Sequence, residues 1–193
     1  MRPNYPLLHR AALLVLLAAA GPGCGTLTGT RYSPLIGTTL ALREARLGKL
    51  SVGTISTGPE SNRNVERVMA RAMFVESAYG TYTAYLREAL TAEFDHADLL
   101  EPASPVRIDG VLLQNELGSE PGGENVIVEA ELTITRDGAI AWRGRKTGHL
   151  AWKSVYPGDV AIPRAMSNYQ AGVQRLIAAF IADPAFVAAL KPR

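Results

Sequence analysis

The feature that most constrains this chain is an apolar run at its start that ends at the only cysteine. Arg2 and Arg10 precede the run, which covers residues 11–20, and glycines and a proline separate it from Cys24. A short basic region, about ten apolar residues and a break are typical of a secretory signal that is removed from the mature protein. We predict a signal peptide over residues 1–23, which leaves 170 of the 193 residues.

The same run is too short to cross a bilayer as a helix. A spanning helix needs about 20 consecutive apolar residues, whereas this run stops at Gly21 and Pro22. The mature length is enough for one domain with its own core. Because one cysteine cannot form a disulfide within the chain, burial of apolar side chains must hold that core together.

The residues around Cys24 resemble the lipobox of bacterial lipoproteins, whose cysteine is lipidated and becomes the first residue of the mature protein. The positions three and two before the cysteine, usually Leu and a small residue, hold Gly21 and Pro22 here. The resemblance implies a lipid anchor on Cys24. Gly25 follows, where Asp often directs retention in the inner membrane of enteric bacteria. The resemblance therefore also implies the outer membrane, with the protein facing the periplasm.

Charge gives no reason to expect a nucleic-acid partner. The whole chain has 20 basic and 18 acidic side chains, and Arg2 and Arg10 in the signal account for the excess. The mature chain is neutral, so it carries no electrostatic argument for nucleic acid or for anionic lipid.

The mature chain divides into a leading segment and one domain. Residues 24–46 are predicted to be the lipidated N-terminus and a tether, because small and polar residues dominate their first half and no period is visible. An irregular strand-and-loop segment is the alternative. Residues 47–193 form the predicted domain, with a first strand expected at 47–56. Residues 65–75 fit a short helix or a short strand.

Two long helices are predicted from apolar residues at three- and four-residue spacing. The first covers about residues 81–97, with Thr81 as its N-cap. The second opens at Ile162-Pro163, and Asp183-Pro184 then starts a short terminal helix. Three tyrosines near the first helix are predicted to pack in the core: Tyr79, Tyr82 and Tyr85.

Three strands are expected between the helices, at about 106–117, 125–135 and 139–153, and a change of phase near Gly110 suggests a bulge. The turn at residues 136–138 decides how the last two strands pair. A two-residue turn would place charge on the buried face, so we predict a three-residue loop with a left-handed Gly138. That loop pairs Ile134 with Ile140, Leu132 with Trp142, Glu131 with Arg143, and Glu129 with Arg145.

These elements together predict an α+β fold. The expected architecture is a single-layer antiparallel sheet of four to five strands, with both long helices packed on one face. The outer face of the central hairpin is polar.

The sequence shows no catalytic, nucleotide-binding or cofactor motif whose spacing supports a reaction, and we expect no enzyme, no cofactor and no metal. Asp95, His96 and Asp98 could ligate a metal, but a histidine at a helix end more often interacts with the helix dipole. Two further charged groups are predicted to be solvated. They are His149 with Arg143, Arg145 and Lys153 on one strand, and Glu116, Glu120 and Glu124 around a glycine-rich loop.

The aromatic residues that precede the two long helices are the candidate partner-binding site. Both helices begin after irregular segments that carry aromatic side chains, and such side chains are enriched in interface hot spots. The alternative is that they close the ends of the core. This candidate rim consists of Phe74, Tyr79, Trp152 and Tyr156.

The stretches Gly80–Leu90 and Val160–Pro163, with the segment Asp183–Phe186, are similar to a group of uncharacterised bacterial lipoproteins. The likeness covers most of residues 47–190. The layout is also similar, at fold level, to lipoproteins that assist lipopolysaccharide export and to auxiliary lipoproteins of ABC transporters.

We therefore expect a non-enzymatic accessory module, anchored to the membrane by lipid on Cys24, that binds an envelope protein in outer-membrane assembly or transport. The alternative is a periplasmic carrier or sensor of a small apolar ligand or lipid, which would need an apolar cavity between sheet and helices. Large apolar residues argue instead for a filled core: Phe94, Trp142, Tyr169 and Phe180.

Overall fold

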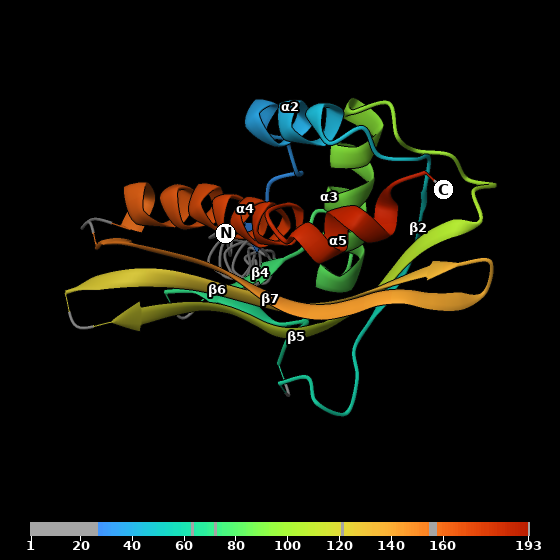
Figure 1. Cartoon of the computed structure of the whole chain (residues 1–193). Coiled ribbons are helices and arrows are strands. Elements are labelled where there is room, and N and C mark those ends of the chain that lie inside the picture. Colours follow the sequence, from blue (N-terminus) through green and yellow to red (C-terminus); the bar gives the residue numbers. More distant parts are fainter. Residues whose placement is uncertain (1–26, 63, 72, 121, 155–157, 193) are drawn as a thin grey trace, which may run out of the picture.

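The computed structural model describes residues 27–62, 64–71, 73–120, 122–154 and 158–192 (Figure 1). The predicted signal peptide and Cys24 lie outside the described residues. The elements in chain order are β1 (Leu27–Thr28), α2 (Ile36–Glu44), β2 (Ser51–Ser56), β3 (Val68–Ala70), β4 (Met73–Glu76), α3 (Tyr82–His96), β5 (Val106–Glu120), β6 (Gly123–Arg136), β7 (Ala139–Lys153), α4 (Gly158–Ile181) and α5 (Pro184–Leu190).

The main sheet has the strand order β2–β5–β6–β7. The strands β5, β6 and β7 form a long antiparallel meander, and alternate residues of β6 are buried as predicted. The first strand differs from the prediction, because β2 pairs with β5 in parallel. Parallel neighbours need a long crossover, and here that crossover contains β3, β4 and α3.

A second sheet has the order β1–β4–β3, so the prediction of a single-layer sheet is wrong. Residues 65–75, which fitted a helix or a strand, contain β3 and the start of β4, paired as an antiparallel hairpin. The strand β1 pairs with β4 in parallel, with Leu27 opposite Val75. The chain therefore joins the folded domain at Leu27.

Residues 27–46 pack on the domain, which corrects the predicted tether for all of its described part. Within this segment α2 buries Leu42 completely and leaves Thr38 only 5% exposed. The sequence did not reveal this helix, because three of its nine residues are Gly or Thr, which have low helix propensity. The domain thus begins earlier than residue 47.

The described residues contain four helices, α2 to α5, and Figure 1 shows them on one side of the β5–β6–β7 ribbon. The hydroxyl of Thr81 accepts a hydrogen bond from Ala84 N at 3.0 Å, which confirms the predicted cap of α3. Asp183 caps α5 as predicted and accepts from Ala185 N at 2.8 Å. The helix α4 begins at Gly158, before the predicted start.

The β6–β7 register differs from the prediction at the turn. Asp137 and Gly138 both have positive φ, 52° and 80°, and form a two-residue turn that pairs Arg136 with Ala139. A bulge at Ala141 then shifts the register, so that Ile134 lies opposite Trp142. The bulge restores the predicted alternation of apolar and charged faces without the three-residue loop.

The predicted pairs are consequently displaced. Leu132 lies opposite Gly144, Glu131 opposite Arg145 and Glu129 opposite Thr147, while Ile140 is 60% exposed. Acid still meets base on the outer face, because Arg145 Nε contacts Glu131 Oε2 at 2.9 Å. Such solvated pairs contribute only a few tenths of a kcal/mol each, so they mark register and form no site.

The bulge in β5 is also displaced from its predicted position. The register with β6 shifts between Leu112 and Gln114, which leaves Leu113 as the extra residue instead of Gly110. Both Leu112 and Leu113 are buried, so the phase change occurs at this pair.

The close contact between α4 and the sheet depends on two glycines. A Cβ at Gly148 of β7 would clash with the carbonyl oxygen of Gly172 in α4 and lie 2.6 Å from Leu176 N. A Cβ at Gly172 would lie 2.7 Å from Val126 Cγ1. Only residues without a side chain permit the helix backbone to approach the strand this closely.

The space between the main sheet and the helices is filled with side chains. Phe94, Phe180 and Phe186 are at most 1% exposed. The half-buried Trp142 packs edge-on against Phe186, with ring centroids 5.1 Å apart. These contacts agree with the expectation of a filled core.

No single helix among the described residues has the length and apolar character needed to cross a membrane. The helices α4 and α5 meet those criteria only as a pair, and the chain bends by 75° between them.

We predict that Gly148→Ala lowers the free energy of unfolding by about 2–3 kcal/mol, because the added methyl forces α4 away from β7. Urea denaturation of the variant and the wild type measures the change. Gly37→Ala is the control, since a Cβ there meets nothing within 4 Å and alanine in a helix stabilises by up to about 1 kcal/mol. Equal destabilisation by both substitutions would contradict the close-contact explanation.

Candidate functional site

The three described residues of the predicted aromatic rim do not form one exposed surface. Phe74 is 49% exposed on β4. Tyr79 is half-buried, and its hydroxyl accepts a hydrogen bond from Tyr32 N at 3.2 Å. Trp152 is half-buried and packs against both the main core and a smaller buried group that includes Ala70. Tyr156 lies outside the described residues.

Tyr79 belongs to a cluster of tyrosines beneath α2. The rings of Tyr79 and Tyr85 are 5.6 Å apart, and Tyr85 also meets Tyr169 of α4 at 5.4 Å, both nearly edge-on. Tyr82 donates its hydroxyl hydrogen to the Val75 carbonyl at 2.9 Å. The predicted core role of Tyr82 and Tyr85 agrees with their burial, but their hydroxyls are buried too.

Glu93 is a fully buried carboxylate on the core face of α3. Its Oε1 accepts hydrogen bonds from the Tyr32 hydroxyl at 2.6 Å and from Leu35 N at 3.1 Å. Burial raises the pKa of Glu93, and these two hydrogen bonds offset part of the rise. The carboxylate therefore holds the segment that leads into α2. Sequence reasoning missed it, although its spacing from Leu86, Ala89 and Leu90 places it on the predicted buried stripe.

Glu124 is a second buried carboxylate, and it links the β3–β4 hairpin to the end of the main sheet. Arg71 Nε donates to Oε1 at 2.8 Å, and Trp152 Nε1 donates to Oε2 at 2.8 Å. Arg71 also donates to Ser154 Oγ at 2.8 Å. Burial opposes ionisation, but the hydrogen bonds from Arg71, Trp152 and Ser154 outweigh it and lower the pKa of Glu124.

The prediction that Glu124 is solvated is therefore wrong, since it is only 8% exposed. Glu116 is on the surface as predicted, where its Oε1 accepts from Asn62 Nδ2 at 2.9 Å. The loop composition alone could not separate these two carboxylates, because their difference depends on the distant residues Arg71 and Trp152.

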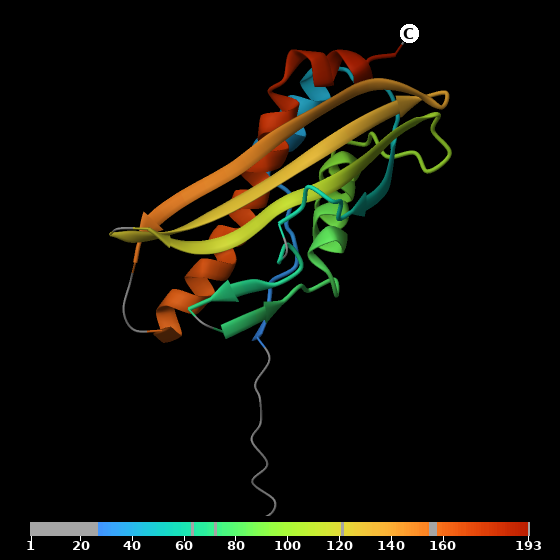
Figure 2. The same cartoon turned by 90° about the horizontal axis from the view of Figure 1, so that it is seen from below.

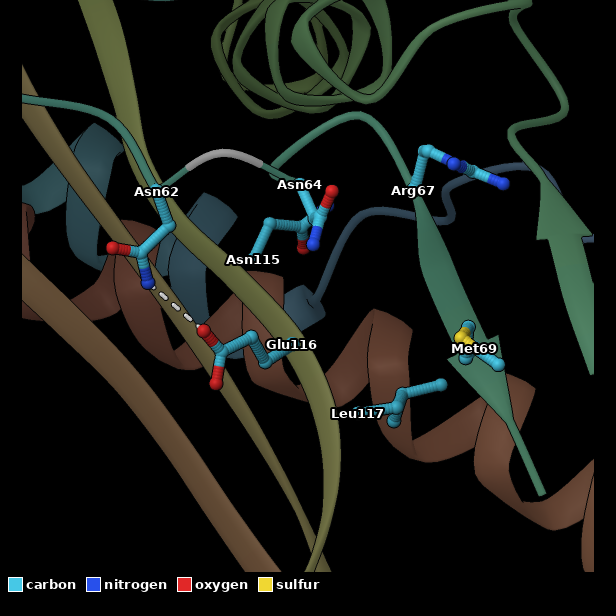
Figure 3. A pocket seen from close by; sticks show the side chains of 7 residues that line it. All are labelled: Asn62, Asn64, Arg67, Met69, Asn115, Glu116 and Leu117. Atoms are coloured by element: carbon cyan, nitrogen blue, oxygen red, sulfur yellow. Dashed lines mark hydrogen bonds between the residues drawn. The ribbon is translucent and has the colours of Figure 1, made fainter. Parts of the chain in front are cut away.

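An open pocket of about 410 Å³ lies between residues 62–67, β3 and β5 (Figure 3). At its base Asn115 is 2% exposed and donates from Nδ2 to the Val65 carbonyl at 2.7 Å. The pocket lies outside the space between the main sheet and the helices, and both polar and apolar side chains line it. The lining residues are Asn62, Asn64, Arg67, Met69, Asn115, Glu116 and Leu117.

The end of α3 is occupied by a contact with α2. Arg43 donates to the His96 carbonyl and to Asp98 Oδ2, each at 2.8 Å. Among the described residues, no group of three or more His, Cys, Asp and Glu side chains is arranged to hold a metal ion. The geometry thus assigns Asp98 a structural contact.

Comparison with known proteins finds similarity only among solved structures. No family model and no curated protein matches the chain. The protein XCC0632 from Xanthomonas campestris, of the family DUF330, superposes with a TM-score of 0.56 at 11% identity, covering 85% of this chain and 96% of that chain. This chain therefore shares the fold of XCC0632, a likeness that carries no information on activity.

A protein from Caulobacter crescentus, described as a "putative lipoprotein", gives a TM-score of 0.46 at 14% identity. The match covers 79% of this chain and 96% of that chain.

Replacing Glu93 with Gln should remove a pH dependence of stability. A carboxyl whose pKa is raised on folding destabilises the folded state as pH increases from the ordinary value through the raised one. Glu93→Gln cannot ionise and retains an acceptor oxygen for Tyr32 and Leu35. We expect the variant to gain stability relative to wild type between pH 5 and pH 8, measured by urea denaturation. Unfolding free energies of variant and wild type that change in parallel with pH would contradict this. Glu93→Ala should lower the free energy of unfolding by about 1–3 kcal/mol, because it leaves the Tyr32 hydroxyl and the Leu35 N–H without an acceptor.

The Glu124 pair should show the opposite pH dependence. A lowered pKa gives stability that is present above the ordinary carboxyl pKa and is lost as pH falls through the lowered value. Glu124→Gln should cost about 1–2 kcal/mol at pH 7, since the pair with Arg71 is only partly solvated. The deficit should shrink on acidification. Glu116→Gln is the matched control, expected within about 0.5 kcal/mol of wild type, and equal effects would refute the assigned role.

Proposed function

We propose that the protein is a lipid-anchored lipoprotein of the bacterial envelope that works by binding a partner, without catalysis. Its anchor is lipid on Cys24, and its place is the outer membrane, facing the periplasm. The partner is an envelope protein of outer-membrane assembly or transport. The lipobox-like residues support the lipid anchor. The resemblance to auxiliary lipoproteins supports a role in outer-membrane assembly or transport.

An exposed apolar surface on α2 carries the binding proposal. Ile36 is 78% exposed and Leu40 is 54% exposed, and their four-residue spacing places them on one helix face. Leu35, directly before the helix, is 45% exposed. A solvent-facing helix surface is normally polar, and clustered apolar side chains mark interaction sites.

Contacts on the domain side of α2 and at its two ends position this surface. Leu42 buries the opposite side of α2, and Glu93 binds the backbone of Leu35. Arg43, in the last turn of α2, contacts Asp98 and the His96 carbonyl at the end of α3. A surface that is already ordered loses little conformational entropy when a partner binds, so more of the contact energy contributes to affinity.

The filled core favours partner binding over the alternative of an apolar carrier. Phe94 and Phe180 occupy the space between the layers, and the pocket in Figure 3 lies outside that space. The two buried carboxylates are both used to hold peripheral segments, which agrees with a binding module.

One cross-linking experiment in intact cells tests this proposal. We expect the mature protein to begin with an acylated Cys24 by mass spectrometry and to cross-link to one envelope protein. Ile36→Asp should abolish that cross-link, because a charge cannot be buried in an apolar interface. Ile140→Asp is the matched control, since Ile140 is equally an exposed apolar residue, and it should leave the cross-link intact. An unmodified N-terminus, or equal loss in both variants, would contradict the proposal.

A further inference from the structure

We infer that the hairpin edge, formed by the start of β1 and the turn end of the β3–β4 hairpin, lies directly against the phospholipid leaflet that holds the anchor. This inference rests on the proposed lipidation of Cys24. It adds an orientation and a second contact with the membrane to that anchor.

The length of chain between Cys24 and the fold gives the first step. Only Gly25 and Thr26 separate Cys24 from Leu27, the first residue of β1. An extended chain spans at most about 3.6 Å per residue, so the Cα atoms of Cys24 and Leu27 are no more than about 11 Å apart. Neighbouring strands lie about 4.8 Å apart, so β4 and β3 are within about 10 Å of β1. A lipidated Cys24 thus brings the small sheet to the bilayer.

The strand directions give the second step, because they show which edge of the small sheet faces the anchor. The strands β1 and β4 are parallel, so both begin at the same edge. The strand β4 begins at Met73, and the antiparallel β3 ends there at Ala70. The first residue of β1, Leu27, lies opposite Val75, two residues from the start of β4, so the N-terminal end of β1 is directed toward the hairpin turn. Figure 2 shows β1 and this hairpin at one end of the molecule, with the β6–β7 turn at the other.

The exposed side chains at this edge give the third step. Met69 and Phe74 face each other across the hairpin and are 40% and 49% exposed. Met73, at the start of β4, is 41% exposed. Transfer of these large apolar side chains out of water lowers the free energy, which favours their insertion at the boundary between headgroups and acyl chains.

The charges near the edge are compatible with headgroups. The guanidinium carbon of Arg67 lies 4.3 Å from the centroid of the Phe74 ring, so a cation accompanies this exposed aromatic. Such a side chain can bury its stem while its charge contacts a lipid phosphate. The nearby acid Glu124 is paired with Arg71, whereas Glu76 lies at the other end of β4. A second copy could cover the same side chains, but the anchor would bring lipid to them without any association.

Single-cysteine labelling tests the contact. Lipidation consumes the thiol of Cys24, the only cysteine, so an introduced cysteine can be labelled alone. Full-length lipidated Met73→Cys and Ile140→Cys proteins, each carrying an environment-sensitive fluorophore, are reconstituted in phosphatidylethanolamine–phosphatidylglycerol vesicles with spin-labelled quencher lipid. We expect blue-shifted, lipid-quenched emission at position 73 and an aqueous, unquenched signal at position 140. Adding Phe74→Asp should remove most of the quenching at position 73.

The outcomes separate this inference from the proposed function. Mass spectrometry of the mature N-terminus on the same samples reports lipidation. An unmodified N-terminus overturns both claims. A lipidated protein whose fluorophore at position 73 is not quenched by the lipid overturns the membrane contact alone. If that unquenched emission is blue-shifted, protein and not lipid covers the hairpin edge.

Discussion

Helix α4 can contact as many parts of the domain as it does because Gly148 and Gly172 let its backbone approach the main sheet. From that position Tyr169 reaches the tyrosines of α3, and Phe180 packs against Trp142. Its N-terminal half meets the small sheet, where Ala165 and Met166 share a buried cluster with Ala70 and Val75. A position of α4 further from the sheet would weaken all three contacts. The position of the small sheet, and so of the proposed membrane edge, follows from the glycine contact.

Two buried carboxylates then fix the segments that carry the proposed functions. Glu93 holds the residues before α2, whose outer surface is the proposed partner site, and Glu124 holds the hairpin, whose edge is proposed to meet lipid. Their pKa values move in opposite directions, because Glu93 is buried with only neutral donors whereas Glu124 is paired with Arg71. The partner site and the membrane edge are therefore held by separate contacts, and a substitution in one should leave the other intact.

The sequence predicts local features of this fold well and distant ones poorly. The caps at Thr81 and Asp183 depend on neighbouring residues alone, and both predictions are confirmed. The β6–β7 turn differs from the prediction because the bulge at Ala141 shifts the register and returns the apolar residues of β7 to the buried face. The composition of this stretch gives no sign of the bulge. The parallel pairing of β2 with β5 joins Ser51 with Arg107, segments far apart in the sequence, which periodicity cannot reveal. Of the candidate rim, Phe74 is exposed, whereas Tyr79 and Trp152 lie half-buried, and burial depends on tertiary contacts.

The central claim is that the folded domain begins three residues after Cys24, the proposed anchor, and that it therefore lies directly on the membrane. Neutron reflectometry of the lipidated protein on a supported bilayer tests this claim most directly. The account predicts protein density that is continuous with the headgroup layer. A water-rich layer separating the domain from the headgroups would contradict it.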